Sequence, residues 1–129
     1  MIAHVQTADG LAVVDLEEEA VVELDPGGAI EVGAAPVLSL PRVRAAAAVG
    51  STIVALVDTK PPLVVSHDAG RTWRESGRGL PTGRAVAISP EDPDVVLYAA
   101  RNRLYLSRDG GRFWRGLALE LPEITGVAL

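Results

Sequence analysis

The chain has 129 residues and a formal net charge of −5, with 48% hydrophobic and 22% charged residues. This composition supports one domain with a buried core and excludes a disordered chain. The negative charge argues against a nucleic-acid partner, the lack of cysteine excludes disulfides and thiolate metal sites, and no apolar run is long enough to cross a bilayer. No secretion signal opens the chain, so we expect a cytoplasmic location, although a secreted chain whose signal had been removed would look the same.

Short apolar runs separated by Gly, Pro, Asp and Asn predict an all-β fold, because no segment has a helical period. Two registers are open at the N-terminus. In one, Glu23-x-Asp25-x-Gly27 is a decayed copy of a motif that occurs twice later in the chain. We favour the other, in which Asp9-Gly10 is a hairpin turn between strands 2–7 and 11–15, because this dipeptide is a strong turn signal. A third strand is then expected at 20–24.

A longer connection, residues 25–41, follows and is rich in Gly and Pro; an additional strand is expected there at 29–32. The remaining predicted strands are 44–49, 52–57, 63–66, 72–75, 84–89, 95–100, 104–107, 113–117 and 124–129. They form two successive groups of four and one final strand.

The motif that organises these groups is an octapeptide. SHDAGRTW at 66–73 returns as SRDGGRFW at 107–114, 41 positions later, and both copies fit S-x-D-x-G-x-x-W. The Asp carboxylate and the Ser hydroxyl can hold a hairpin turn, the Gly permits positive φ, and the Trp offers a large apolar surface. We therefore interpret one set of residues as structural: Ser66, Asp68, Gly70, Trp73, Ser107, Asp109, Gly111 and Trp114.

These two octapeptides make the chain similar to the Asp-box (BNR) repeat proteins, a group of β-propellers that includes sialidases. The resemblance covers at least residues 43–129. It implies four-stranded antiparallel blades, with about three blades in one half-propeller domain, 1–129. The expected blade segments are about 1–40, 41–81 and 82–122, followed by a closing strand at 123–129.

Three blades cannot close a ring, whereas two chains give six, within the usual range for propellers. We therefore expect a homodimer in which strand 124–129 of each chain completes the first blade of its partner. The alternative is that the chain is a piece of a longer, single-chain propeller.

The resemblance also implies a ligand face at the loops opposite the octapeptides. Its polar residues would be Asp9, Arg42, Lys60, Arg78, Arg84, Arg101, Asn102, Arg103, Glu120 and Glu123. Arg42, Arg44 and Arg84 are similar to part of the arginine cluster of sialidases, but the FRIP-type arginine motif is missing. The only tyrosines, Tyr98 and Tyr105, fall on predicted strands.

No catalytic residue is assigned. Glu120 and Glu123 could form a glycosidase acid pair between two chains, but solvated rim residues are the favoured interpretation. The acidic run 17–19 is interpreted as a solvated turn, with a weak cation patch as the alternative. His4 and His67 do not form a ligand cluster with other residues, and neither a metal nor a cofactor is expected.

Two functions remain open. We favour a non-catalytic propeller that acts as a protein- or glycan-binding or assembly scaffold through homo-oligomerisation, with no nucleic-acid or membrane partner. The alternative is a sialidase-like glycoside hydrolase acting in the central cleft of the assembled propeller.

Overall fold

The computed structural model describes residues 1–30, 36, 38, 40 and 42–129, which form twelve β-strands and no helix. This confirms the all-β prediction. The strands make three four-stranded sheets, and every pairing within them is antiparallel.

We name the sheets by their order along the chain. The first sheet has the strand order β12-β1-β2-β3, the second β4-β5-β6-β7 and the third β8-β9-β10-β11. The bounds in the first sheet are β1 Ile2–Thr7, β2 Gly10–Asp15, β3 Ala20–Asp25 and β12 Ile124–Ala128. Those in the second are β4 Val43–Val49, β5 Thr52–Val57, β6 Leu63–Ser66 and β7 Arg74–Ser76. Those in the third are β8 Ala85–Ile88, β9 Val96–Ala99, β10 Leu104–Ser107 and β11 Arg115–Gly116.

The favoured N-terminal register is confirmed, because β1 and β2 form a hairpin across Ala8 and Asp9. Gly10 has φ of 128°, which side chains rarely adopt, and its carbonyl accepts a 2.9 Å hydrogen bond from Thr7 Oγ1. The additional strand expected at 29–32 is not found at Ala29 and Ile30, which lie outside any strand. Its other two positions lie outside the described residues.

The last strand completes a sheet of its own chain. β12 pairs with β1, with Val127 opposite Val5 and Ala128 opposite His4. The sequence predicts that this strand joins a partner's sheet, whereas the structure places it beside the edge of β1. A strand on the same chain is at high effective concentration, which favours pairing within the chain wherever the geometry permits it.

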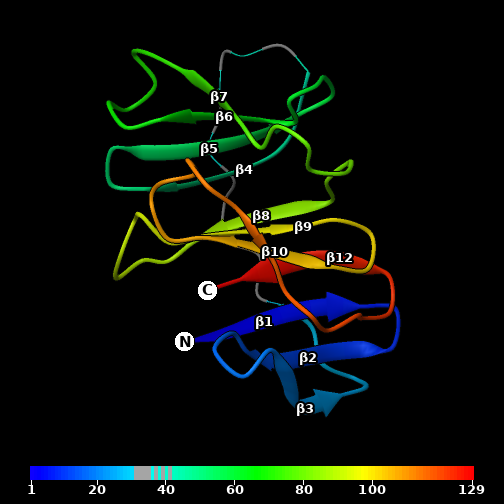
Figure 1. Cartoon of the computed structure of the whole chain (residues 1–129). Coiled ribbons are helices and arrows are strands. Elements are labelled where there is room, and N and C mark those ends of the chain that lie inside the picture. The colour runs from blue at the N-terminus through cyan, green and yellow to red at the C-terminus, as the bar shows by residue number, and fades with distance from the viewer. Residues whose placement is uncertain (31–35, 37, 39, 41) are drawn as a thin grey trace.

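The third sheet lies between the other two, as the stack in Figure 1 shows. Successive residues of β8 and β9 point to opposite faces. Ala87 and Leu97 pack with the first sheet, and Ile88 and Tyr98 pack with the second. The sheets approach one another most closely at β4, β8 and β12. The core is therefore two apolar layers, one on each face of the third sheet.

Tyr98 ties the third sheet to the loop that precedes it. Its ring is fully buried, lies edge-on to Tyr105 and Trp114, and its hydroxyl donates a hydrogen bond to the carbonyl of Pro81. A side chain at Gly83 would overlap the tyrosine, because a Cβ there would lie 2.4 Å from Tyr98 Oη. Burial raises the pKa of Tyr98 to about 12, so the neutral phenol is the form that the fold holds.

We predict that Tyr98→Phe lowers the free energy of unfolding by about 1 kcal/mol, because the part-buried hydrogen bond from the phenol to the Pro81 carbonyl is lost. Urea unfolding followed by fluorescence measures this change. Tyr105→Phe is the matched control, since the Tyr105 ring is only partly buried, and it should cost less.

The same pair of variants tests the pH dependence. A raised pKa in the folded state means that the contribution of Tyr98 is complete below pH 10 and is lost as pH rises through about 12. The wild type and Tyr105→Phe should therefore lose stability over this range, and Tyr98→Phe should lose less. Equal losses in all three proteins would contradict the assignment.

Candidate functional site

The edge strands β4, β8 and β12, one from each sheet, line an open groove of about 780 Å³. Its floor consists of small side chains from β4, β8 and β12, including the run Ala45–Ala48. Arg44 and Arg84, at the starts of β4 and β8, are the charged residues of its lining. The groove is open to solvent, its floor is mostly apolar, and the two arginines lie at its edge.

An ion-pair cluster stands next to this groove. Glu123 lies 3.1 Å from Arg84 and 3.8 Å from Arg101, and its backbone carbonyl accepts a hydrogen bond from Ala8. Arg44 pairs with Asp58 at 3.6 Å. The structure thus brings together Arg84, Arg101 and Glu123 from the predicted ligand face.

A second pair lies nearby. Glu120 lies 3.4 Å from Arg103, and the Asn102 amide donates a 3.0 Å hydrogen bond to the carbonyl of Leu121. Arg103 and Glu120 are both well exposed, so this pair contributes little to stability. Asn102 fixes the loop after β11 and is a positioning residue for it.

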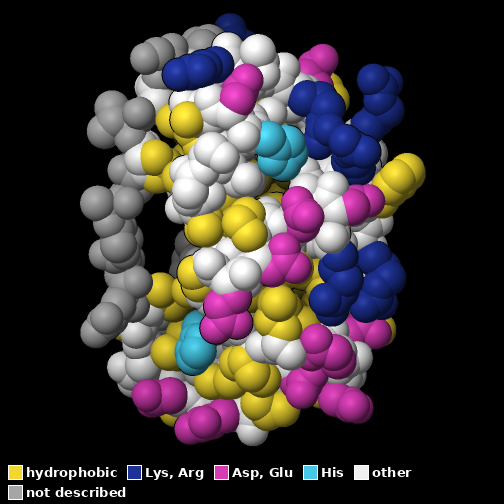
Figure 2. Space-filling model, turned by 90° about the vertical axis from the view of Figure 1, so that its left-hand side faces the viewer, with side chains coloured by type: hydrophobic (Ala, Val, Ile, Leu, Met, Phe, Trp, Pro, Cys, Tyr) yellow, Lys and Arg dark blue, Asp and Glu magenta, His cyan; other side chains and the backbone are white. Residues whose placement is uncertain are grey.

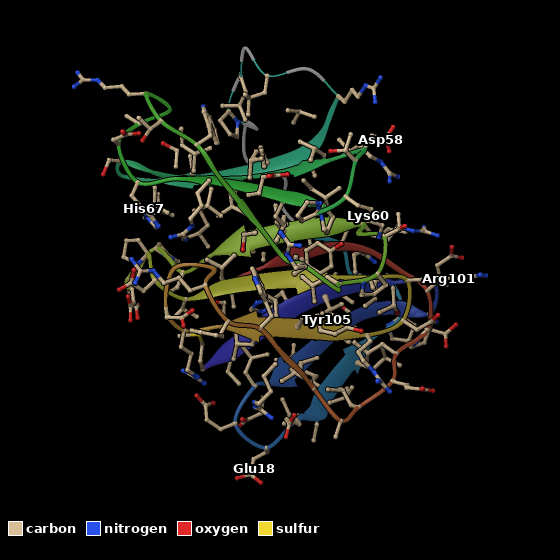
Figure 3. The ribbon with its side chains drawn as sticks, turned by 45° about the horizontal axis from the view of Figure 1, so that its top comes forward. Glu18, Asp58, Lys60, His67, Arg101 and Tyr105 are labelled. Carbon is tan, nitrogen blue, oxygen red and sulfur yellow. The ribbon has the colours of Figure 1, made fainter. Side chains whose placement is uncertain are left out.

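The other predicted ligand-face residues stand apart from this cluster. The Lys60 ammonium donates to the carbonyl of Leu80, the Arg42 carbonyl accepts from the amide of Asp58, and Arg78 lines a separate, smaller hollow. Asp9 is exposed in the β1–β2 turn. Figure 3 shows Asp58, Lys60 and Arg101 at one end of the strands and His67 at the opposite end.

The chemistry of the cluster is that of ion pairing. Glu123 and Glu120 each have an arginine partner, Arg84 and Arg103. No three His, Asp or Glu side chains of the described residues come together as a metal site. Nor does any helix in this part of the chain have the length and hydropathy of a membrane span.

The first octapeptide is a hydrogen-bonded turn at the opposite end of the strands. Ser66 Oγ donates to Asp68 Oδ1 at 2.8 Å and accepts from the Gly70 amide at 2.8 Å. Asp68 also accepts from the Thr72 amide at 2.9 Å and the Thr72 hydroxyl at 2.6 Å. These donors, led by the Thr72 hydroxyl, lower the pKa of Asp68 to about 2.

The second octapeptide has the same geometry. Ser107 Oγ donates to Asp109 Oδ1 at 2.8 Å and accepts from Gly111 at 2.9 Å. The amides of Arg112 and Phe113 donate to Asp109 Oδ1, and the bond from Phe113 has the larger part in lowering the pKa of Asp109. Both aspartates are thus engaged within their own turns, as a structural role requires.

The acidic turn of the first sheet has a role that its sequence did not reveal. Glu19 Oε1 accepts 3.0 Å hydrogen bonds from the Arg115 guanidinium on β11 and from the Ala118 amide in the loop that follows it. Glu17 pairs with the amino group of Met1 and lies 3.6 Å from Arg108. The run therefore joins two sheets and is not merely a solvated turn. The sequence offered one signal for these contacts: Arg108 lies in the second octapeptide and Arg115 directly after it, and both are cations that could pair with an acidic turn.

A clamp that sequence reasoning missed holds the same turn. Asp15 Oδ1 accepts hydrogen bonds from the amides of Glu17 and Glu18, both at 2.9 Å. The hydrogen bond from Glu18 is the main cause that lowers the pKa of Asp15. The first sheet thus has an aspartate-held turn without the octapeptide.

Comparison of the chain with family models, with curated proteins and with solved structures finds no match. The similarity to Asp-box proteins therefore depends on the two octapeptides.

We predict that Asp68→Asn lowers the melting temperature by a few degrees and flattens its dependence on pH in acid. A lowered pKa in the folded state means that the contribution of Asp68 is complete above pH 3.8 and is lost as pH falls through about 2. Thermal unfolding between pH 5 and pH 2 measures both effects.

Asp9→Asn is the matched control, because Asp9 is also exposed in a hairpin turn. Its melting curve should follow that of the wild type across the same pH range. An unchanged acid dependence in Asp68→Asn would show that the carboxylate does not hold the turn.

Proposed function

We propose that the chain is a non-catalytic β-propeller half of the Asp-box type, which assembles with a second copy into a six-bladed ring and acts as a protein- or glycan-binding scaffold. The observation that carries this proposal is the arrangement of the sheets. Three four-stranded antiparallel sheets stack with their first strands β4, β8 and β12 nearest one another, which is how blades surround a propeller axis.

The two end sheets support assembly, because each has a face that no other sheet of the described residues covers. On the first sheet, among the described residues, this face holds Ile2, which is well exposed and lies opposite Asp15, together with the partly exposed Leu11 and Val13. Exposed apolar faces of this kind mark interaction surfaces in soluble proteins. A second copy would bring the number of sheets to six and leave no end face in water.

The rim of the groove supports binding rather than catalysis. Arg84, Arg101 and Glu123 offer a cation-rich, hydrogen-bonding border beside an apolar floor. Such a border suits the hydroxyl and carboxylate groups of a glycan or of a peptide chain.

The alternative, a glycoside hydrolase, has one observation in its favour: Glu123 lies at the rim of the groove, where a second carboxylate could come from another copy. Retaining and inverting enzymes both need two carboxylates about 5–10 Å apart across the substrate. In a ring of two copies, Glu123 would occur twice around one axis.

Light scattering tests the assembly. We predict a particle of twice the chain mass of 13.5 kDa. A particle that stays at 13.5 kDa at all concentrations would contradict the proposed ring.

Turnover and binding assays separate the two functions. The purified protein should bind on a glycan array or retain a peptide or protein ligand without hydrolysing chromogenic glycosides. Arg84→Ala should weaken that binding, since it removes a rim cation, while Arg108→Ala, at the octapeptide end, is the control. Hydrolysis that disappears in Glu123→Gln would favour the enzyme.

A further inference from the structure

The two junctions inside the chain show how one sheet docks on the next. Where the second sheet meets the third, Leu63 and Val65 pack against Tyr98 and Trp114. The Trp114 indole donates to Ser76 Oγ at 3.2 Å, and the Ser76 hydroxyl donates to the carbonyl of Gly111. The tryptophan of one octapeptide thus reaches the last strand of the preceding sheet.

The junction between the third and first sheets adds an ion pair. The Arg115 guanidinium, on the last strand of the third sheet, lies 3.0 Å from the carboxylate of Glu19. Glu19 lies in the turn between β2 and β3 of the next sheet. A cation on a last strand therefore meets an anion in the neighbouring turn.

On the face of the first sheet turned away from the third, the side chains occupy the same strand positions that the second sheet uses to contact the third. Val13 and Leu11 lie across from Glu23 and Asp25. In the second sheet, Val65 and Leu63 lie across from Arg74 and Ser76 in the same register. Because side chains alternate along a strand and Ala12 and Val14 pack on the third sheet, Leu11 and Val13 face away from it. Gly28 and Ile30 cover one edge of this face, where they bond to Gln6.

The uncovered face of the second sheet has the complementary set. Ala55 and Val64 lie across from each other and alternate with residues that pack on the third sheet; Ala55 is already buried within the chain, and Val64 is partly exposed. The Trp73 ring lies beside Gly70, as the Trp114 ring lies beside Gly111. The structure gives no hydrogen bond to the Trp73 indole among the described residues, whereas the Trp114 indole has two acceptors.

Charge is divided between the same two ends. Residues 1–41 contain eight Asp and Glu and no Lys or Arg, whereas residues 42–82 contain six Lys and Arg and three Asp and Glu. Figure 2 shows acidic side chains gathered over the end formed by the first sheet, with Lys and Arg over the other two sheets. An acidic end and a basic end attract each other, whereas two ends of one kind repel.

We infer that the first sheet of one copy docks head to tail on the second sheet of another copy, with Glu23 opposite Arg71 and Asp25 accepting from the Trp73 indole. This inference rests on the proposed ring and names its interface. Glu23 occupies the position on the last strand of the first sheet that Arg115 occupies in the third. Arg71 lies in the turn of the second sheet that corresponds to the turn of Glu19 in the first. The proposed Glu23–Arg71 pair therefore repeats the Arg115–Glu19 pair with the charges exchanged. Asp25 occupies the position of Ser76, the partner of Trp114.

A charge exchange between copies tests this geometry. Glu23→Arg and Arg71→Glu change exposed side chains for which the described residues provide no ion pair, so each variant should fold. Sedimentation equilibrium at low ionic strength should show each variant alone dimerising at least about tenfold more weakly than the wild type. An equimolar mixture should dimerise within about threefold of the wild type, because both junctions of the mixed dimer again have opposite charges.

Matched controls lie on the third sheet, which stands between the two ends. Arg112→Glu changes the octapeptide position that corresponds to Arg71, and Glu91→Arg reverses another exposed acid. Neither should change the dimer dissociation constant. Trp73→Phe should weaken the dimer without unfolding the chain, as circular dichroism would show.

The outcomes distinguish the ring from its interface. A wild type that remains monomeric contradicts both proposals. A wild-type dimer that neither reversal weakens, or a mixture that stays as weak as its components, overturns the head-to-tail docking and leaves the assembly intact. If only one of the two reversals weakens the dimer, two copies of the same end are in contact, and this result also overturns the head-to-tail docking.

Discussion

The rest of the structure depends on the third sheet being apolar on both faces. All residues of β8 and β9 are buried, and they alternate between two core layers. A sheet of this kind is stable only when it is covered on both sides. The first and second sheets provide that cover, and they are held in place by it. Tyr98 and Gly83 show how close the fit is, since a single methyl group at Gly83 would meet the phenol.

The octapeptides act at the edges of this core. In each, a serine and an aspartate hold the turn that precedes the tryptophan. Trp114 meets its neighbour inside the chain, through Ser76. Trp73 lies in the same way beside Gly70, on the face of the second sheet turned away from the third. The second octapeptide thus completes a core within the chain, and the first is the one that we propose takes part in docking.

The polar groups of the chain follow the same division. At one end of the strands, aspartates accept hydrogen bonds from their own turns and have lowered pKa values, which gives them a structural role. At the other end, Glu123 gathers Arg84 and Arg101 beside an apolar groove. This second cluster is the one whose charges face outward and could meet a ligand. The proposed binding role rests on this second cluster, whereas the aspartates at the first end hold the turns.

The sequence by itself determined the strands, because apolar runs and turn residues are local signals: the bounds of Ile2–Thr7, Thr52–Val57, Leu63–Ser66 and Leu104–Ser107 agree with prediction. It also predicted the first hairpin, although the structure places the two-residue turn at Ala8 and Asp9 rather than at Asp9-Gly10, and it identified Asp68 and Asp109 as turn residues, since their partners lie within a few positions. It predicted the ligand-face residues but not that Glu123 would join Arg84 to Arg101, because that contact depends on how loops of different sheets meet. Only the tertiary structure decided that β12 pairs with β1 and that Glu19 holds Arg115. Both contacts join residues about a hundred positions apart, whose pairing depends on the order in which the sheets stack rather than on any local pattern.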